Sequence, residues 1–177
     1  MPTLIVHTDS EPGESVRLLL ERVGVWLTTR GVRHQVIPLD SPELPAQAIK
    51  ARAVIGVGSG RDGGVTPLTG FLRQLPEDGL AGAGFLWIST DAQGTAGDEC
   101  LGSFWFALQR AGITLLLRPV QLEDTISDGN DLSDRDGRRL SAGMIALVES
   151  LDFCRRLKQQ QTSLELAERF AIAPLLA

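Results

Sequence analysis

Short apolar runs that alternate with helix-like stretches are the feature of this sequence that most limits its fold. The runs at 3–6, 53–57, 84–88 and 113–117 are apolar almost throughout, and 32–39 is a fifth candidate strand that also contains Arg33, His34 and Gln35. Strands that are buried on both faces have this uninterrupted apolar composition. Strands separated by helices pair in parallel through right-handed crossovers. We therefore predict an α/β fold of three layers, with a five-stranded parallel sheet and helices on both faces.

The stretches between these runs have the three- and four-residue apolar spacing of amphipathic helices. Gly31 and Gly112 follow two of them as helix stops, and Thr66 precedes Pro67 as an N-cap precedes a first helical residue. Three glutamines separate two helices near the C-terminus. We assign residues 1–158 to one domain and 159–177 to a C-terminal helical extension of it. The predicted helices span residues 16–27, 67–75, 99–111, 133–157 and 163–170.

Composition excludes several classes of protein. The chain has 177 residues and a net charge of −5, so no basic surface indicates binding to nucleic acid or to an anionic membrane. The start, MPTLIV, lacks the basic region of a secretion signal, and no run reaches the ~20 apolar residues of a membrane helix. Cys100 and Cys154 lack metal-site spacing. We expect reduced thiols and a cytoplasmic location.

No motif for metal or nucleophilic catalysis is present. His7 and His34 are too few and too far apart for a usual metal site. The segment GVGSG lacks the lysine of a phosphate-binding loop, and GxGxxG does not follow the first strand. A phospho-receiver would need an aspartate where Val57 stands and a lysine where Arg118 stands. Because the chain carries no such group, a bound cofactor would have to supply any reactivity.

The loops at 7–15, 56–65 and 89–99 are the best candidates for a binding site. Each follows a predicted strand and is rich in Gly, Ser, Thr or Asp. Ligands of open α/β sheets bind beyond the carboxyl ends of the strands, where the strand order reverses. Glycine lets backbone N–H groups approach a ligand closely. The alternative is that the loops are plain turns.

The acidic segment EDTISDGNDLSDRD after the fifth predicted strand is a weaker candidate. It lacks the order of ligands and the glycine of an EF-hand. We interpret it as a solvated loop that ends with Ser133 as the N-cap of the following helix. No metal site is predicted.

The segment STDAQGTAGDECLGSFWFALQRAGITLL resembles flavodoxin-like NAD(P)H:quinone oxidoreductases and NADPH-dependent FMN reductases, nearest to the tryptophan-repressor-binding-protein (WrbA-type) branch. Ser89, Thr90, Gly94, Gly97 and Glu99 fall at the family's positions. ARAVIGVGSGRDGGVTPLTGFLRQL is similar to its third strand, flavin-ring loop and next helix, and LSDRDGRRLSAGMIALVESL to its last helix. The resemblance covers roughly residues 3–152 and implies a flavodoxin-like fold.

The resemblance also implies a function. A member of this family binds FMN and passes electrons from NAD(P)H to a quinone or a flavin, and it assembles as a homodimer or tetramer. The flavin carries the redox chemistry, so no catalytic side chain is implied. The residues that the resemblance assigns to the FMN site are Thr8, Ser10, Gly13, Glu14, Ser15, Gly58, Ser59, Gly60, Arg61, Gly63, Ser89, Thr90, Asp91, Ala92, Gln93, Gly94, Gly97 and Glu99.

The loops depart from the family pattern in three places. Asp9, Glu11 and Glu14 bring negative charge to the expected phosphate loop, although acids also stabilise a helix N-terminus without any ligand. Gly60 and Asp62 stand where the family has a proline and an aromatic residue. The loop after the fifth strand is short, so an NAD(P)H pocket does not follow. These departures favour an alternative, a flavodoxin-like protein that has lost FMN and serves as an oligomeric binding or scaffold module.

The aromatic cluster FWF at 104–106 bears on association. Phe104, Trp105, Leu101 and Leu108 form one apolar stripe of the predicted helix, and Phe106 points roughly 100° away. This helix therefore has more apolar surface than one contact requires. It is predicted to pack under another element of the chain or against a partner subunit.

Overall fold

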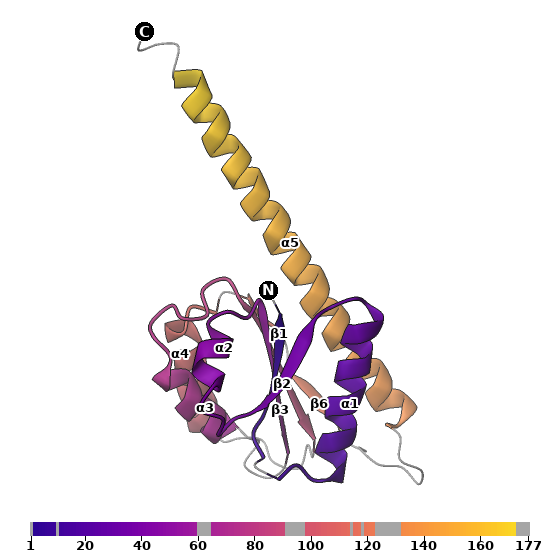
Figure 1. The fold of residues 1–177 in the computed structure, drawn as a ribbon. Helices are drawn as coiled ribbons and strands as arrows, with labels where there is room; N and C mark the ends of the chain where they lie inside the picture. The colour runs from indigo at the N-terminus through magenta and orange to yellow at the C-terminus, as the bar shows by residue number, and fades with distance from the viewer. Residues whose placement is uncertain are drawn as a thin grey trace.

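A computed structural model of the chain describes residues 2–9, 11–59, 65–90, 98–113, 115–117, 119–122 and 132–172. Strands and helices alternate along most of the chain (Figure 1). The elements are β1 (Thr3–His7), α1 (Glu14–Thr29), β2 (His34–Pro38), α2 (Leu44–Ala48), β3 (Ala53–Ser59), α3 (Val65–Gln74), β4 (Gly84–Thr90), α4 (Asp98–Arg110), β5 (Leu115–Leu116), β6 (Val120–Leu122) and α5 (Asp134–Ile172).

The strands form one parallel sheet in the order β2-β1-β3-β4-β5, with β6 also paired to β4. β5 pairs with the start of β4 and β6 with its end, so the two short strands share the fifth position of the sheet. The predicted five-stranded parallel sheet is confirmed, but the bounds 113–117 for its last strand are wrong. Pro119, which has no N–H to donate to a strand ladder, lies between the two pieces.

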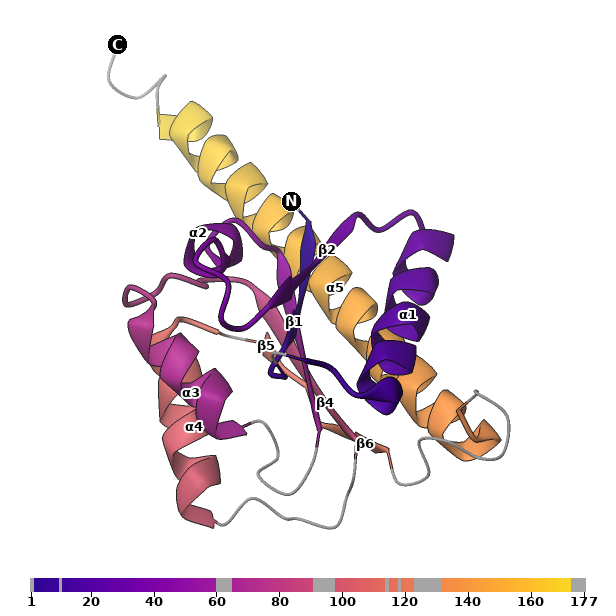
Figure 2. The same cartoon turned by 60° about the horizontal axis from the view of Figure 1, so that its bottom comes forward.

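Helices cover both faces of the sheet, as predicted (Figure 2). On one face, Leu19 of α1 and Met144 of α5 are buried against Ile55 and its neighbours. On the other, residues of α2, α3 and α4 join Val54 and Phe85 in a second cluster. β1, β3 and β4 therefore bury both of their faces, which explains their uninterrupted apolar runs. β2, which ends the sheet, is partly exposed at Gln35 and Val36.

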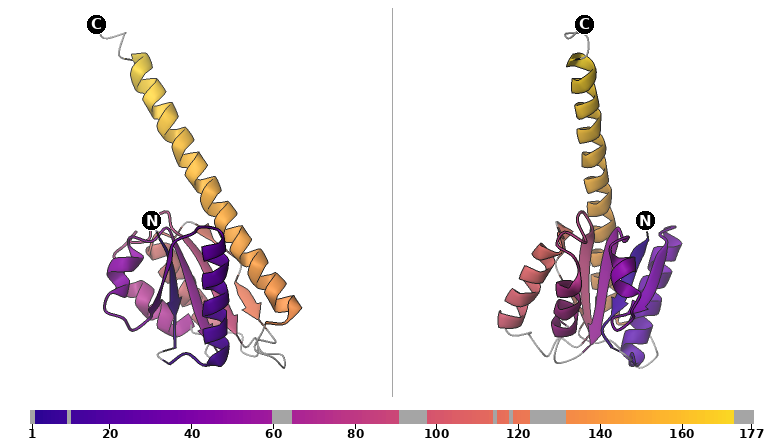
Figure 3. Two further views of the ribbon diagram at one scale, coloured as in Figure 1. Left: turned by 45° about the vertical axis from the view of Figure 1, so that its right-hand side comes forward. Right: turned by 60° about the vertical axis from the view of Figure 1, so that its left-hand side comes forward.

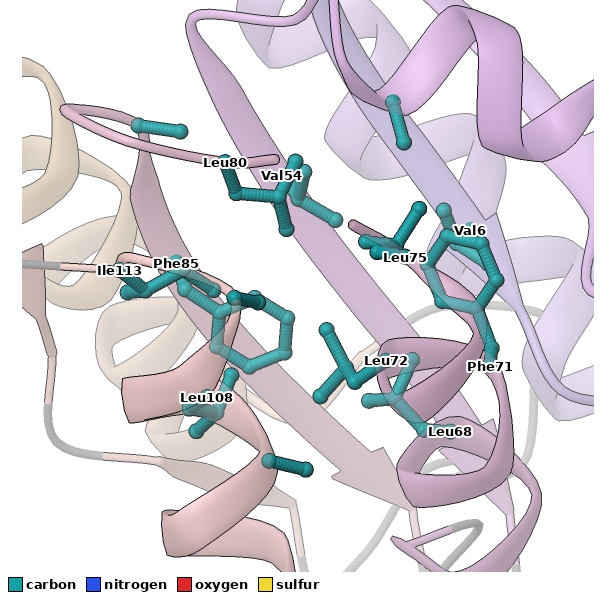
Figure 4. Packing of buried hydrophobic residues seen from close by; sticks show 14 of the residues in the cluster. Val6, Val54, Leu68, Phe71, Leu72, Leu75, Leu80, Phe85, Leu108 and Ile113 are labelled. Carbon is teal, nitrogen blue, oxygen red and sulfur yellow. The ribbon is translucent and has the colours of Figure 1, made fainter. Parts of the chain in front are cut away.

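The cluster on the α2–α3–α4 face illustrates how this packing holds the layers together (Figure 4). The Phe85 ring of β4 meets the Phe104 ring of α4 edge to face, with centroids 5.8 Å apart. Phe71 and Leu72 of α3 and Leu108 of α4 are buried in the same cluster. Truncating one such side chain to alanine typically costs about 2–5 kcal/mol.

Two predicted helix stops are confirmed and two helix predictions are corrected. Gly31 and Gly112 have positive φ values of 68° and 80°, the left-handed conformation that ends a helix. α3 begins at Val65, so Thr66 lies inside its first turn rather than at the N-cap. The sequence does not predict the short α2, because the prolines of this segment also end a strand. Pro45 instead occupies the start of that helix, where a missing N–H costs little.

α5 is one helix of 39 residues and not two. The predicted break at the three glutamines is wrong because no glycine or proline lies between Gly143 and Pro174 to end the helix. Near its middle, Asp152 accepts a hydrogen bond from Arg52 at 3.2 Å. Beyond that point the helix extends away from the sheet (Figure 3). In the described parts of the chain, no helix is long and apolar enough to cross a membrane.

α4 contacts the rest of the fold through a narrower stripe than predicted. Phe104, Ala107 and Leu108 are buried, whereas Trp105 is 48% exposed and Phe106 65% exposed. Trp105, predicted on the same apolar stripe as Phe104 and Leu108, is therefore not covered by another described element, and its contact with a partner subunit stays a prediction. The helix packs against α3 and β4 along the spacing 104, 107, 108 and 111, which turns position 105 outward. The side chain of Leu101 lies outside the described residues.

Candidate functional site

The carboxyl ends of β1 and β3 form the point at which the strand order reverses. From β1 the chain passes through α1 to β2 on one side, and β3 lies on the other side of β1. α1 covers one face of the sheet and α3 the opposite face. The connections after β1, β3 and β4 therefore leave three adjacent strands at the same edge. This is the place where ligands bind in open α/β sheets.

β3 and β4 each extend two residues beyond the prediction. Gly58 and Ser59, which were predicted as loop residues, are the last residues of β3 and pair with Ser89 and Thr90 of β4. The sequence ended these strands early because small polar residues are typical of turns. Their place in the ladder gives these four predicted site residues fixed backbone positions at the edge of the sheet.

Thr90 is the most informative of them. Its side chain is 1% exposed, and its Oγ1 atom has no hydrogen-bond partner among the described residues. A buried hydroxyl without a partner costs about 1–3 kcal/mol. Ser89, the preceding residue, is also buried, at 9% exposed. Thr90 thus offers an unsatisfied polar group at the strand ends.

The β1–α1 connection is the predicted phosphate loop. Thr8 N–H donates to the Val57 carbonyl at 3.0 Å, which extends the sheet by one bond. Gly13 is the N-cap of α1, and no side chain of the described residues caps this helix. Helix N-terminal N–H groups without a cap can donate to an anion. Ser15, half-buried in the first turn, adds a hydroxyl.

The acids of this loop are mostly turned to solvent. Glu11 and Glu14 are exposed, and Asp9 is half-buried. The Thr8 hydroxyl lies 3.4 Å from a carboxylate oxygen of Asp9, and the His7 Nδ1 atom is 2.8 Å from the Asp9 carbonyl oxygen. Charges surrounded by water are screened over about 10 Å at ordinary ionic strength. The two glutamates therefore weigh less against an anion here than their sequence positions imply.

Sequence reasoning missed Trp87. A Cβ atom on Gly56 would lie 2.5 Å from Trp87 Cε3, and one on Gly58 would lie 2.7 Å from Trp87 Cη2 and 2.8 Å from the Thr8 hydroxyl. The indole thus occupies the space that side chains at both glycines would fill. The Gly-x-Gly spacing on β3, opposite a tryptophan on β4, was the available signal.

A proline-lined cavity of about 670 Å³ opens beside Thr8, between the segment after β2 and helix α3. Its volume falls within the range of small-molecule sites. It was not predicted, since none of the three candidate loops includes the segment after β2. The cavity is lined by Thr8, Leu39, Asp40, Ser41, Pro42, Pro45, Pro67, Gly70, Phe71 and Gln74.

Two other hollows lie along helices. One, of about 510 Å³, runs between α5 and the β5–β6 segment and includes Arg139 and Gly143. The other, of about 520 Å³, lies between α1 and β2 and includes Gly24 and His34. Among the described residues, no group of three His, Cys, Asp or Glu side chains is placed to hold a metal ion. Ser133 caps α5, as predicted, with its hydroxyl 3.2 Å from the Asp136 N–H.

The remaining predicted site residues lie partly or wholly outside the described residues. The structure describes the backbones of Ser59 and Glu99 but not their side chains. The other members of the predicted set lie wholly outside the described residues: Ser10, Gly60, Arg61, Gly63, Asp91, Ala92, Gln93, Gly94 and Gly97. Their roles stay predictions.

Comparison with known proteins gives similarity in structure alone. No protein-family model and no curated sequence matches the chain. Oxidised flavodoxin 2 from Bacillus cereus has 14% identity and a TM-score of 0.64, with 85% of this chain and 99% of that one covered. An NADH:FMN oxidoreductase in its apo form has 14% identity and a TM-score of 0.56, with 87% and 88% covered. An oxidoreductase from Corynebacterium diphtheriae has 15% identity and a TM-score of 0.58, with 85% and 96% covered.

The TM-scores of 0.56–0.64 establish the fold, whereas identities of 14–15% assign the chain to no branch of it. The strand order β2-β1-β3-β4-β5, the parallel pairing and the coverage of 99% of that flavodoxin support the same fold. The chain has a flavodoxin-like α/β fold.

Proposed function

We propose that the chain binds FMN across the carboxyl ends of β1, β3 and β4 and passes electrons from NAD(P)H to a quinone or a flavin. The buried hydroxyl of Thr90, which lacks a partner among the described residues, carries this proposal. It lies at the edge of the sheet where a flavodoxin-like fold is expected to hold a ligand. Similarity to a flavodoxin and to an NADH:FMN oxidoreductase supports the choice of ligand.

The described residues fit the two ends of such a ligand. The phosphate would lie at the uncapped N-terminus of α1, within reach of the hydroxyls of Thr8 and Ser15. The ring would lie toward β3 and β4, where Gly58 presents backbone without a side chain and Thr90 presents a hydroxyl that bonds to no described residue. This arrangement accounts for both an uncapped helix and an unsatisfied polar atom at one edge of the sheet.

When bound, FMN would supply the redox chemistry. The contribution of the protein is to bind and orient. Val57 near the end of β3 and Ile88 near the end of β4 are fully buried, so water is excluded beneath the strand ends. Hydrogen bonds from the strand ends to a ligand are stronger in such surroundings than in water. No described side chain is required as a general acid or base.

A second function, a binding or scaffold module without flavin, is favoured by the acids of the β1–α1 loop. A carboxylate about 6 Å from a phosphate opposes its binding by about 3 kcal/mol per charge pair at an effective dielectric near 20. Glu11 and Glu14 are exposed, which reduces this opposition, but Asp9 is half-buried beside Thr8. Asp9 is therefore the residue on which the choice between the two functions depends most.

An absorbance spectrum of concentrated protein and an FMN titration followed by flavin fluorescence test the proposal. We expect flavin bands, or saturable quenching at micromolar FMN, and then oxidation of NAD(P)H with a quinone. The variant Asp9→Ser with Glu11→Arg should bind FMN more tightly if charge limits binding. A colourless protein that leaves FMN fluorescence unchanged, in both forms, would contradict the oxidoreductase function and leave the binding module.

Self-association as a homodimer or tetramer, in the cytoplasm, belongs to the same proposal. The exposed Trp105 and Phe106 on α4 support it, because adjacent large aromatic side chains on a surface often mark a protein interface. Sedimentation velocity should give a species larger than the 19.1 kDa chain, and Trp105→Ser with Phe106→Ser should reduce it to a monomer. A monomeric wild-type protein would contradict it.

A further inference from the structure

The proline-lined cavity adjoins the proposed FMN site without being part of it. Among the described residues that line it, Thr8 is the one that also belongs to the predicted FMN set. The other lining residues come from residues 39–45, after β2, and from one face of α3. A ligand in this cavity would therefore lie beside the β1–α1 loop and on the α3 side of the sheet.

The wall formed by residues 39–45 is preorganised. The Leu39 N–H donates to the His7 carbonyl at 2.9 Å, which extends the β1–β2 ladder beyond β2. The Ser41 N–H donates to the Pro38 carbonyl and the Leu44 N–H to the Ser41 carbonyl, each at 3.1 Å. Pro42 and Pro45 restrict the backbone further. A ligand that binds here orders little chain, so less affinity is lost to conformational entropy.

The chemistry of the lining selects a ligand with hydroxyl groups and a flat apolar part. The Asp40 carboxylate can accept hydrogen bonds from two adjacent hydroxyl groups of a ligand, and Ser41 and Gln74 offer further polar groups. Phe71 and the proline rings give an apolar wall. Asp40 is exposed, so water weakens its repulsion of a phosphate, but a phosphate in direct contact with its carboxylate would still be disfavoured. These properties together fit a nucleoside better than a nucleotide phosphate.

The position of Asp40 supports the same ligand. It lies two residues beyond the end of β2, beside the loop that follows β1. In dinucleotide-binding α/β sheets, an acid near the end of the second strand accepts the ribose hydroxyls and discriminates against a ribose 2′-phosphate. In this sheet β2 also neighbours β1, so the acid stands in a comparable place relative to the first loop.

We propose that the proline-lined cavity binds the ribose and base of a nucleoside, with Asp40 accepting the vicinal hydroxyls of the ribose. If the proposed function also holds, on which this second step rests, the nucleoside is the adenosine end of the reductant. Asp40 then makes the protein prefer NADH to NADPH, because the latter carries a phosphate on that ribose.

Gly70 allows the cavity to be filled without damage to the fold. It lies in α3 with a helical backbone, it is exposed, and a Cβ there would meet nothing within 4 Å. Gly70→Leu places a side chain in the cavity and replaces a poor helix former by a good one. Gly102 in α4 is likewise exposed and open around its Cβ position but does not line the cavity, so Gly102→Leu is the matched control.

The test is a calorimetric or NMR titration of the full chain with adenosine, 2′-deoxyadenosine and adenosine 2′-monophosphate, without FMN. Wild-type protein and Gly102→Leu should bind adenosine saturably, and Gly70→Leu should bind it about tenfold more weakly or not at all. The two analogues should bind the wild type about tenfold more weakly than adenosine. 2′-Deoxyadenosine lacks one of the hydroxyls that would donate to Asp40, and the 2′-phosphate is repelled by the Asp40 carboxylate. Asp40→Asn should reduce that discrimination to within about threefold, whereas Glu43→Gln, which removes a nearby exposed charge outside the cavity, should retain it.

The inference is overturned if adenosine does not bind, if Gly70→Leu binds it as the wild type does, or if adenosine 2′-monophosphate binds equally well. An FMN titration of the same proteins separates this result from the proposed function. Gly70→Leu should bind FMN as the wild type does. Adenosine binding without FMN binding would leave the nucleoside site and remove the flavin function, and FMN binding without adenosine binding would do the reverse.

Discussion

The two ends of the sheet differ in how their polar groups are satisfied. At the amino ends of the strands, the connections bond to one another: the Gly84 N–H donates to the Arg52 carbonyl at 3.1 Å and the Leu80 N–H to the Ala111 carbonyl at 2.7 Å. Arg52 also reaches Asp152 of α5. At the carboxyl ends, the Thr90 hydroxyl lacks a partner among the described residues, and no side chain caps α1.

This difference separates structural from functional roles within one sheet. Both ends are built from the same buried strands, so burial alone does not distinguish them. The amino end gains stability from its closed turns, whereas the carboxyl end holds polar groups ready for a ligand at some cost in stability. Variants at the two ends should accordingly affect different measurements.

The largest effect on stability is expected beneath the carboxyl end, where Trp87 packs on glycine. Trp87→Ala should lower the free energy of unfolding by about 3–5 kcal/mol, because it leaves a large cavity. Gly56→Ala should cost about 1–3 kcal/mol through overpacking against the indole. The double variant should be less destabilised than the sum, as measured by denaturant unfolding. Strict additivity would show that the two positions are not in contact.

At the amino end, Gly112→Ala should destabilise the chain by about 1–3 kcal/mol. Gly112 has a positive φ, and a Cβ there would lie 2.9 Å from the Asp78 Cα atom. Gly31→Ala, which has a positive φ but open space around its Cβ position, is the control and should cost less. FMN affinity should stay unchanged in both variants. A loss of FMN affinity in Gly112→Ala would break the separation between the two ends.

At the carboxyl end, Thr90→Val should lower FMN affinity and change stability little, the reverse of Gly112→Ala. Removing a hydroxyl without a partner should leave the free energy of unfolding within about 1 kcal/mol of the wild type, while FMN affinity falls about tenfold. Thr69→Val is the control, because the Thr69 hydroxyl is buried but bonded to the Val65 carbonyl at 2.7 Å in α3. Unchanged FMN affinity in Thr90→Val would remove Thr90 from the site.

The smallest effect is expected for the ion pair of the amino end. The side chains of Arg52 and Asp152 are 35% and 49% exposed, and such pairs contribute little in water. Asp152→Asn should lower the free energy of unfolding by less than about 1 kcal/mol at 0.1 M salt, measured by thermal and denaturant unfolding. A loss of several kcal/mol would mean that this contact, and not the buried face of α5, holds the helix to the sheet.

The sheet was predictable because its strands are apolar along their whole buried length, and the end of β4 shows the limit of that signal. Ser89 and Thr90 have the composition of a turn, yet both are buried in the strand. Their burial depends on neighbouring strands that a local pattern does not contain. The same holds for Trp87, which needs Gly56 and Gly58 on β3, and for Asp40, which becomes part of a cavity only when α3 packs across from it.

NMR mapping of FMN binding compares the two ends most directly. In a ¹H–¹⁵N spectrum, glycine amides report from both: Gly13 and Gly58 from the carboxyl end, and Gly31, Gly82 and Gly112 from the amino end. We predict that FMN shifts the signals of the first pair, together with Thr90, in a saturable way and leaves the other three in place. Shifts at the amino end, or no saturable shift at all, would contradict a flavin site at the carboxyl ends of β1, β3 and β4.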